Sequence, residues 1–208
     1  MFALTKSDLN KSILGCGDGP ASANAEITAL GGNIVSVDPI YQFSAAQIRS
    51  RIDAVYPQLM TRMEEDEKKY VWSTIKDVNQ LGEIRMSAME TFLSDYESAS
   101  EEGRYIPACL PDLPFRDHQF ELALCSHFLF LYSEQVNLDQ HIRGISELCR
   151  VAEEARVYPL LALDGVISPH LKPVTDALAK AGVSVSLQPV GYQFQKGAVE
   201  MLVAKRIV

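Results

Sequence analysis

The chain has 208 residues, 47% of them hydrophobic, and a formal net charge of −8 at pH 7. This length and composition suit a single folded domain over residues 1–208. The acidic balance argues against a nucleic-acid partner, because binding to a phosphate backbone depends on many lysines and arginines. No apolar run reaches the roughly eighteen residues of a membrane span, and the first residues lack a signal-like core, so we expect a cytoplasmic protein with no membrane partner.

The first forty residues alternate between helix and strand signals. In chain order they predict a short helix over 4–10, a strand over 12–14, a helix over 21–30 and a strand over 34–37. A glycine-rich turn, GCGDG at residues 15–19, follows the first strand, and Asp38 comes directly after the second strand. This order of elements predicts two parallel strands joined by a helical crossover.

A long segment, residues 44–104, separates the second strand from the third. Capping-box patterns at Ser44 and Ser87 predict two helices, and the first of them should kink or stop at Pro57. An ordinary crossover needs one helix, so this segment is a mainly helical insertion. Two roles remain open: a lid over a binding site, or padding of the sheet that could also serve as a homodimer surface.

The second half of the chain alternates in the same way. It predicts strands over 105–110, 120–126 and 156–163, helices over 137–152 and 168–182, and a terminal strand pair over 183–190 and 198–208. The connection between the last two strands, residues 191–197, is too short for a parallel crossover. We therefore predict that these two strands are antiparallel.

The glycine-rich turn suits ligand binding. Its three alternate glycines let the backbone turn tightly and approach a ligand, and the following helix presents free N–H groups. An acidic side chain after the next strand, here Asp38, can accept hydrogen bonds from a ribose diol. Pro20 stands where the dinucleotide pattern Gly-x-Gly-x-x-Gly has its third glycine, which disfavours a nicotinamide dinucleotide.

The Gly15-x-Gly17-x-Gly19 turn with Asp38 resembles the nucleoside-binding turn of class I S-adenosylmethionine-dependent methyltransferases. A second stretch, DLPFRDHQFELAL at residues 112–124, resembles the Leu-Pro-Phe-x-Asp-x-x-Phe-Asp-Leu pattern of that family. The chain is thus similar to a methyltransferase-11-like domain with a helical insertion. The resemblance implies an α/β, Rossmann-like, doubly wound sheet of seven mostly parallel strands with an antiparallel last strand, and S-adenosylmethionine as cofactor.

The resemblance also implies which residues form the cofactor site. The glycine turn would hold the methionine part, Asp38 the ribose, and the adenine would lie between Ile40 and residues 110–112. The implied cofactor-binding residues are Gly15, Cys16, Gly17, Asp18, Gly19, Asp38, Pro39, Ile40, Leu110, Pro111, Asp112, Cys125 and Ser126.

Structural roles compete with these assignments. Asp38 could serve only as a turn aspartate, and Asp112 could cap the turn before Pro114. Cys16 could be a small residue chosen for fit, and Asp18 a surface residue of the turn. His127, at the end of the predicted strand 120–126, is the candidate catalytic base, and its alternative role is packing against the cofactor.

The chain departs from the family pattern at several places. Ile13 replaces the acidic residue often found two positions before the first glycine. Glu153-Glu154-Ala155 replaces a Lys-Pro-Gly-Gly turn before the fifth strand, so that loop must differ. The pattern typical of base-amino methylation is absent after residue 126. No acidic cluster for a divalent metal occurs there, so we expect no metal site.

These observations predict a methyltransferase that uses S-adenosylmethionine and acts on a small molecule or a protein side chain. The alternative is a protein of the same fold that binds the cofactor in a regulatory or scaffolding role and transfers no methyl group. An aminopropyl transferase ranks lower, because the paired acidic residues that a polyamine would need are missing. The sequence does not identify the acceptor.

Overall fold

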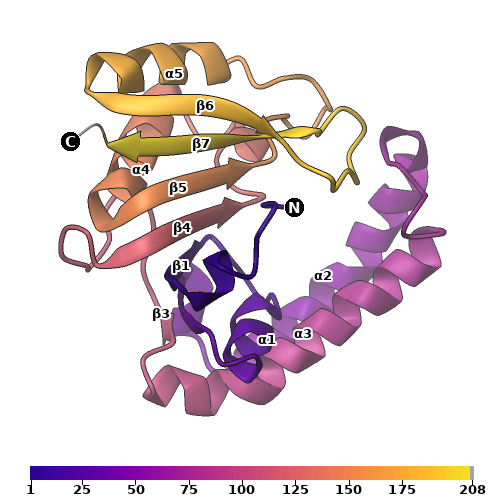
Figure 1. Cartoon of the computed structure of the whole chain (residues 1–208). Helices are drawn as coiled ribbons and strands as arrows, with labels where there is room; N and C mark the ends of the chain where they lie inside the picture. The colour runs from indigo at the N-terminus through magenta and orange to yellow at the C-terminus, as the bar shows by residue number, and fades with distance from the viewer. Residues whose placement is uncertain (207–208) are drawn as a thin grey trace.

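The computed structural model describes residues 1–206, which form a seven-stranded sheet in the order β3-β2-β1-β4-β5-β7-β6 (Figure 1). Its strands are β1 Ser12–Cys16, β2 Asn33–Val37, β3 Tyr105–Ile106, β4 Phe120–Ser126, β5 Ala152–Tyr158, β6 Val183–Pro189 and β7 Glu200–Arg206. Only β7 runs antiparallel to its neighbours, β5 and β6. The predicted doubly wound sheet with an antiparallel last strand is confirmed.

Helices cover both faces of the sheet. They are α1 Ala23–Ala29, α2 Ala45–Glu65, α3 Val78–Glu101, α4 Leu138–Val151 and α5 Leu171–Lys180. On one face, α4 and α5 bury Ile145, Leu148 and Leu178 against the strands. On the other face, α1 and the N-terminal segment bury Ile27 and Phe2. None of the helices in residues 1–206 is long and apolar enough to cross a membrane.

The central strands explain where a ligand would bind. β1 pairs with β2 on one side and with β4 on the other, so the chain leaves β1 and β4 in opposite directions. In doubly wound sheets this arrangement opens a crevice at the carboxyl ends of the two strands. The glycine-rich turn follows β1 and His127 follows β4, so both lie at this crevice.

The insertion is a hairpin of two long helices, α2 and α3, drawn as an arm beside the sheet in Figure 1. Its near end packs on β2 and β3 through an aromatic cluster formed by Tyr41, Phe92, Tyr96 and Tyr105. The Tyr96 hydroxyl donates to the carbonyls of Tyr41 and Phe43, at 2.8 and 2.9 Å. Its far end reaches the loop between β6 and β7. The arm is therefore held at both ends.

The two predicted helices of the insertion begin and end at other residues than expected. Pro57 does not stop α2, which continues to Glu65 because buried Ile52 and Met63 hold the helix in place on either side of the proline. α3 begins at Val78 and not near Ser87. The side chain of Asp77 caps its first turn by accepting from the Gln80 N–H at 2.8 Å.

Three strand predictions also need correction. β3 ends at Ile106 because Pro107 has no N–H to donate to the sheet. β5 begins at Ala152, directly after α4, and ends before Pro159, so residues 153–155 are strand and not loop. β7 covers Glu200–Arg206 of the predicted 198–208, and residues 207–208 lie outside the described part of the chain.

Candidate functional site

The glycine-rich turn adopts backbone conformations that require glycine. Gly17 and Gly19 have φ angles of +70° and +58°, in the left-handed region. The N–H of Gly17 donates to the Val37 carbonyl at 2.9 Å, which fixes the turn to the end of β2. A Cβ on Gly17 would lie 3.1 Å from the Cβ of Phe128, the residue after His127. The turn therefore approaches the segment after β4 closely, with the Phe128 side chain packed against Gly17.

Asp38 ties the glycine-rich turn to β2. One carboxylate oxygen accepts from the Gly19 N–H and the other from the Ile40 N–H, both at 2.9 Å. Burial raises the pKa of this carboxyl, and the two N–H donors oppose that shift. A carboxylate offers about four acceptor positions, so two bonds leave capacity for ribose hydroxyls. Asp38 thus acts as a turn aspartate and still lines a cavity.

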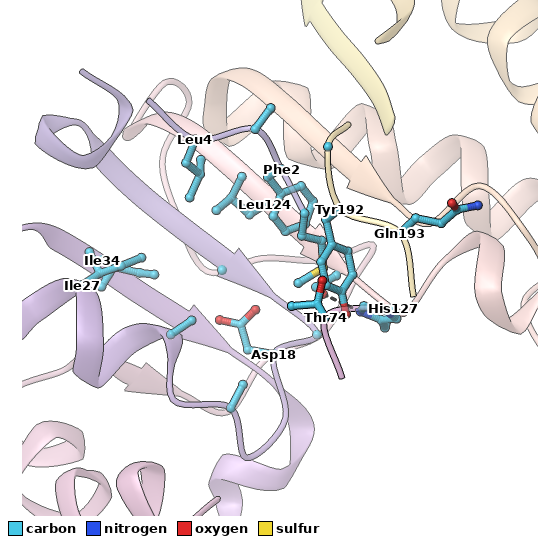
Figure 2. A pocket seen from close by; sticks show the side chains of 18 of the residues that line it. Phe2, Leu4, Asp18, Ile27, Ile34, Thr74, Leu124, His127, Tyr192 and Gln193 are labelled. Carbon is cyan, nitrogen blue, oxygen red and sulfur yellow. Dashed lines mark hydrogen bonds between the residues drawn. The ribbon is translucent and has the colours of Figure 1, made fainter. Parts of the chain in front are cut away.

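Asp18 is not a surface residue of the turn. Its carboxylate accepts a 2.6 Å hydrogen bond from the Ser36 hydroxyl. It lies over Gly15 so closely that a Cβ there would be 1.9 Å from the Asp18 Oδ2 atom. Figure 2 shows this carboxylate pointing into a cavity. Burial raises the pKa of Asp18 to about 6, and the nearby charge of Asp38 adds to the shift.

His127 follows β4 in a strained conformation, with a φ angle of +50°. Its N–H donates to the Tyr158 carbonyl at 2.8 Å, and its Nδ1 lies 2.8 Å from the Ser126 hydroxyl oxygen. Burial lowers the pKa of His127 to about 4, and the positive charge of Arg85 contributes to the same shift. The imidazole is therefore neutral at pH 7.

Three cavities meet at His127. The turn cavity has a volume of about 240 Å³ and is also lined by Cys16, Asp38 and Leu110. The N-terminal cavity, of about 980 Å³, is lined by Phe2, Asp18 and Tyr192. The insertion cavity, of about 550 Å³, is lined by Arg85, Tyr132 and Phe194. His127 lines all three. Each has the size of a small-molecule pocket or part of one.

Most of the predicted site residues come together at these cavities. Cys16, Gly17, Asp38, Pro39 and Leu110 line the turn cavity, and Gly15, Asp18 and Ser126 line the N-terminal cavity.

Five predicted residues lie elsewhere. Cys125 is buried beside its strand partner Cys16, and Ile40 packs against the aromatic cluster of the insertion. Gly19 and Pro111 line none of the three cavities. Asp112 is exposed and lies 3.8 Å from the Arg143 guanidinium, as expected of a turn residue.

Several residues that line the cavities or cover the turn are marked by no motif in the sequence. Phe128 covers Gly17, while Arg85, Tyr70 and Phe194 line the insertion cavity. Arg85 and Tyr70 come from the insertion and Phe194 from the β6–β7 loop, so no local motif connects them to the glycine-rich turn. Within residues 1–206, no group of three or more His, Cys, Asp or Glu side chains is arranged to hold a metal ion.

The chain is similar in sequence to a curated protein and in fold to several solved structures. It is 30% identical over 210 residues to the uncharacterized protein MJ0045 of Methanocaldococcus jannaschii, and the match covers 99% of this chain and 90% of that protein. No protein-family model matches the chain.

Two solved structures are similar at low sequence identity. Magnesium protoporphyrin IX methyltransferase from Synechocystis PCC 6803, crystallised with bound SAH, has a TM-score of 0.50 and 11% identity over 97% of this chain and 77% of its own. The PH0226 protein from Pyrococcus horikoshii OT3 has a TM-score of 0.49 and 12% identity over 95% and 82%. The Synechocystis structure shows that the chain has the fold of class I S-adenosylmethionine-dependent methyltransferases.

Proposed function

Because this chain belongs to the same family as MJ0045 of Methanocaldococcus jannaschii and has the class I methyltransferase fold, we infer that it is an S-adenosylmethionine-dependent methyltransferase. Its acceptor is proposed to be a small molecule. The observation that carries the inference is the turn cavity, where the glycine-rich turn, Asp38 and the loop after β3 line one space. The nucleoside end of the cofactor would bind there.

The residues of the site fit the cofactor. Gly17 lines the turn cavity without a side chain that would fill it, and Asp38 is fixed by two backbone N–H groups with acceptor capacity left for a ribose. On the other side of His127, the Asp18 carboxylate lines the N-terminal cavity and would pair with the ammonium group of the methionine part. The cofactor, once bound, supplies a methyl group that is already activated by the sulfonium.

The insertion cavity is the proposed acceptor site. It adjoins the other two cavities at His127, so an acceptor held there would lie next to the methyl donor. Positioning of the acceptor supplies much of the rate acceleration in such a displacement. With a pKa of about 4, His127 is a weak base at neutral pH, and we assign it to hydrogen bonding and positioning at this junction.

The arm formed by α2 and α3 favours the lid role over the dimer role. Its far end is joined to the β6–β7 loop, with the Val71 N–H donating to the Phe194 carbonyl at 2.7 Å and the Lys196 N–H donating to the Lys69 carbonyl at 2.9 Å. The insertion cavity lies beneath this connection and is lined by Met63 and Tyr70 of the arm.

A regulatory protein that binds the cofactor without methyl transfer is the second candidate. The lowered pKa of His127, which makes this histidine a weak base, is the observation in its favour. Methyl transfer to any compound in an acceptor screen would remove this candidate.

The first experiment is titration calorimetry of the protein with S-adenosylmethionine and S-adenosylhomocysteine. Asp38→Ala should weaken binding by about 1.5–3 kcal/mol, because it removes a charge-assisted hydrogen bond to the ribose. Asp38→Asn, which keeps one acceptor oxygen for the turn, should lose most of the same affinity with less loss of stability.

Asp176→Ala is the matched control, since the Asp176 side chain is exposed, pairs with Lys172 and lines none of the three cavities. Its affinity should equal that of the wild type. Failure of the folded wild-type protein to bind either ligand would contradict the proposed function, and unchanged affinity in both Asp38 variants would place the ribose elsewhere.

A further inference from the structure

Arg85 is a cation without a partner at the wall of the insertion cavity. It lies on α3 and is partly buried. Within residues 1–206 no carboxylate lies within 4.0 Å of its guanidinium, and it has neither a hydrogen bond nor a cation–π contact. Arg104, Arg150 and Arg156, by contrast, each bind carboxylates.

Burial without a partner is costly for a guanidinium. A charge removed from water loses solvation free energy that only a counter-ion or hydrogen bonds can restore. Burial lowers the pKa of Arg85, and the neighbouring phenols of Tyr70 and Tyr192 oppose that shift only in part. The side chain therefore lines the cavity without a hydrogen-bond acceptor from residues 1–206.

Besides Arg85, the insertion cavity is lined by one carboxylate, Asp18, which the proposed function assigns to the ammonium group of the cofactor, and most of its remaining lining is apolar. Met89, Leu131, Tyr132 and Phe194 contribute to its walls. Arg85 is the only lysine or arginine among the described residues that line the turn, N-terminal and insertion cavities. Such a pocket matches a ligand with an apolar body and one anionic group, which a guanidinium can bind through two parallel hydrogen bonds.

We propose that the acceptor is an apolar small molecule bearing a carboxylate or phosphate group, and that Arg85 binds this group in the insertion cavity. The inference rests on the proposed function, which makes the insertion cavity the acceptor site. Anchoring at Arg85 holds the anionic group on the α3 side of the cavity and leaves another part of the acceptor to face His127.

The test uses two fluorescent probes with the same aromatic body. 8-Anilinonaphthalene-1-sulfonate carries an anionic group, and N-phenyl-1-naphthylamine does not. Both are titrated into the wild type, Arg85→Met and Arg62→Met, in the presence of S-adenosylhomocysteine. Arg62 is an exposed arginine of the same arm and serves as the matched control. We expect Arg85→Met to bind the anionic probe at least about tenfold more weakly and the neutral probe unchanged.

Competition then separates the two anionic groups. 2-Naphthoate, 2-naphthyl phosphate and the neutral 2-naphthamide are used to displace the anionic probe from the wild type. One of the two anions should displace it at a concentration at least about tenfold lower than the amide, and this preference should disappear in Arg85→Met. Arg85→Lys, which keeps the charge but not the planar fork, should show an intermediate affinity.

Three results would overturn the proposal: no saturable binding of the anionic probe to the wild type, equal binding to the wild type and Arg85→Met, or equal competition by the amide. Calorimetry with S-adenosylhomocysteine on the same variants separates this failure from failure of the proposed function. If that ligand binds and the probe contrast is missing, only the anion site is wrong. If the probe contrast is present and the ligand does not bind, the methyltransferase assignment is wrong and the anion site stands.

Discussion

The carboxyl group of Asp18 faces the sheet because Gly15 leaves room for it. A Cβ at position 15 would overlap the Asp18 Oδ2 atom, so glycine is needed here for packing rather than for its φ angle. The carboxylate thus lies over Gly15, within β1.

Asp18 should make the stability of the protein depend on pH. Its pKa of about 6 is above the value near 3.8 of an unperturbed aspartate, so between these values the folded chain binds more protons than the unfolded chain. The contribution of Asp18 to the free energy of unfolding is then fully present below pH 3.8 and is lost as the pH rises through 6. Asp18→Asn, which cannot ionise, should match the wild type near pH 4 and be more stable near pH 7.5, by on the order of 2 kcal/mol.

Thermal unfolding of both proteins over this pH range tests the prediction. His127, whose pKa is lowered to about 4, makes stability rise with pH between 4 and 6.5, but it is present in both proteins and cancels from their difference. A difference in melting temperature that stays constant from pH 4 to 7.5 would show that Asp18 does not titrate in this range.

At the scale of elements, an aromatic contact joins the arm to the β6–β7 loop. Tyr70 and Phe194 stack with ring centroids 4.8 Å apart, and Trp72 meets Phe194 edge to face at 5.4 Å. This aromatic contact adds to the backbone hydrogen bonds that join the two segments. Phe194 therefore joins the roof of the insertion cavity through both its ring and its backbone carbonyl.

Phe194→Ala should loosen the roof without unfolding the protein. Removal of a partly buried ring from this contact should cost about 1–2 kcal/mol locally, which raises the population of the open arm about tenfold. Hydrogen exchange of residues 66–76 measures the effect, and exchange in β1 and β4 should not change.

Phe43→Ala is the control for this variant. Phe43 lies at the near end of the arm and is 46% exposed. Exchange at residues 66–76 should remain slow in this protein. Equal acceleration in both variants, or acceleration throughout the sheet in Phe194→Ala, would argue against a locally closed roof.

At the scale of the whole molecule, a buried ion pair joins the N-terminal segment to the sheet. Arg156 on β5 lies 3.1 Å from Asp8 and also donates to the Phe2 carbonyl at 2.9 Å. Phe2 in turn lines the N-terminal cavity. Hydrogen bonds from Lys11, Thr5 and Arg156 outweigh the effect of burial and hold the pKa of Asp8 well below its usual range. A residue far from the glycine-rich turn thus shapes the wall of the proposed cofactor site.

Asp8→Asn should lower the free energy of unfolding at pH 7 by about 3 kcal/mol, because it leaves Arg156 with one fewer buried counter-ion. A depressed pKa contributes stability above pH 3.8 that is lost as the pH falls, so the difference from the wild type should shrink near pH 3. Urea unfolding at both pH values tests this. Asp176→Asn, which breaks an exposed pair with Lys172, should change stability by less than about 0.5 kcal/mol. Equal effects of the two substitutions would refute the role of Asp8.

Much of the fold could be predicted because local signals agree with the packing. The strand over 120–126 and the helix that follows Asn137 match β4 and α4, since their apolar periodicities reflect real burial. β5 was misplaced because Glu153 and Glu154 look like loop residues. Glu154 is in fact compatible with a strand, since Arg156 and Lys205 pair with its carboxylate.

The residues of the candidate site also fall into two groups, those that a local sequence motif indicates and those that only tertiary packing brings there. Asp38 and the glycines could be predicted, because a turn motif is local and its geometry follows from the residues themselves. Arg85 and Phe194 could not, because tertiary packing brings them to His127 from segments far away in the sequence. Ile40 packs in part against the aromatic cluster of the insertion, and its contact with adenine stays a prediction.

The contact between Gly15 and Asp18 also constrains how the sequence can change over time. A Cβ at position 15 would force the Asp18 carboxylate to move, because both would occupy the same space. Among descendants of a common ancestor, the two positions should therefore tend to vary together, with aspartate at 18 mostly beside glycine at 15. A search pattern that expects the acid before the turn will miss such sequences, and one written as Gly-x-Gly-Asp-Gly will retrieve them.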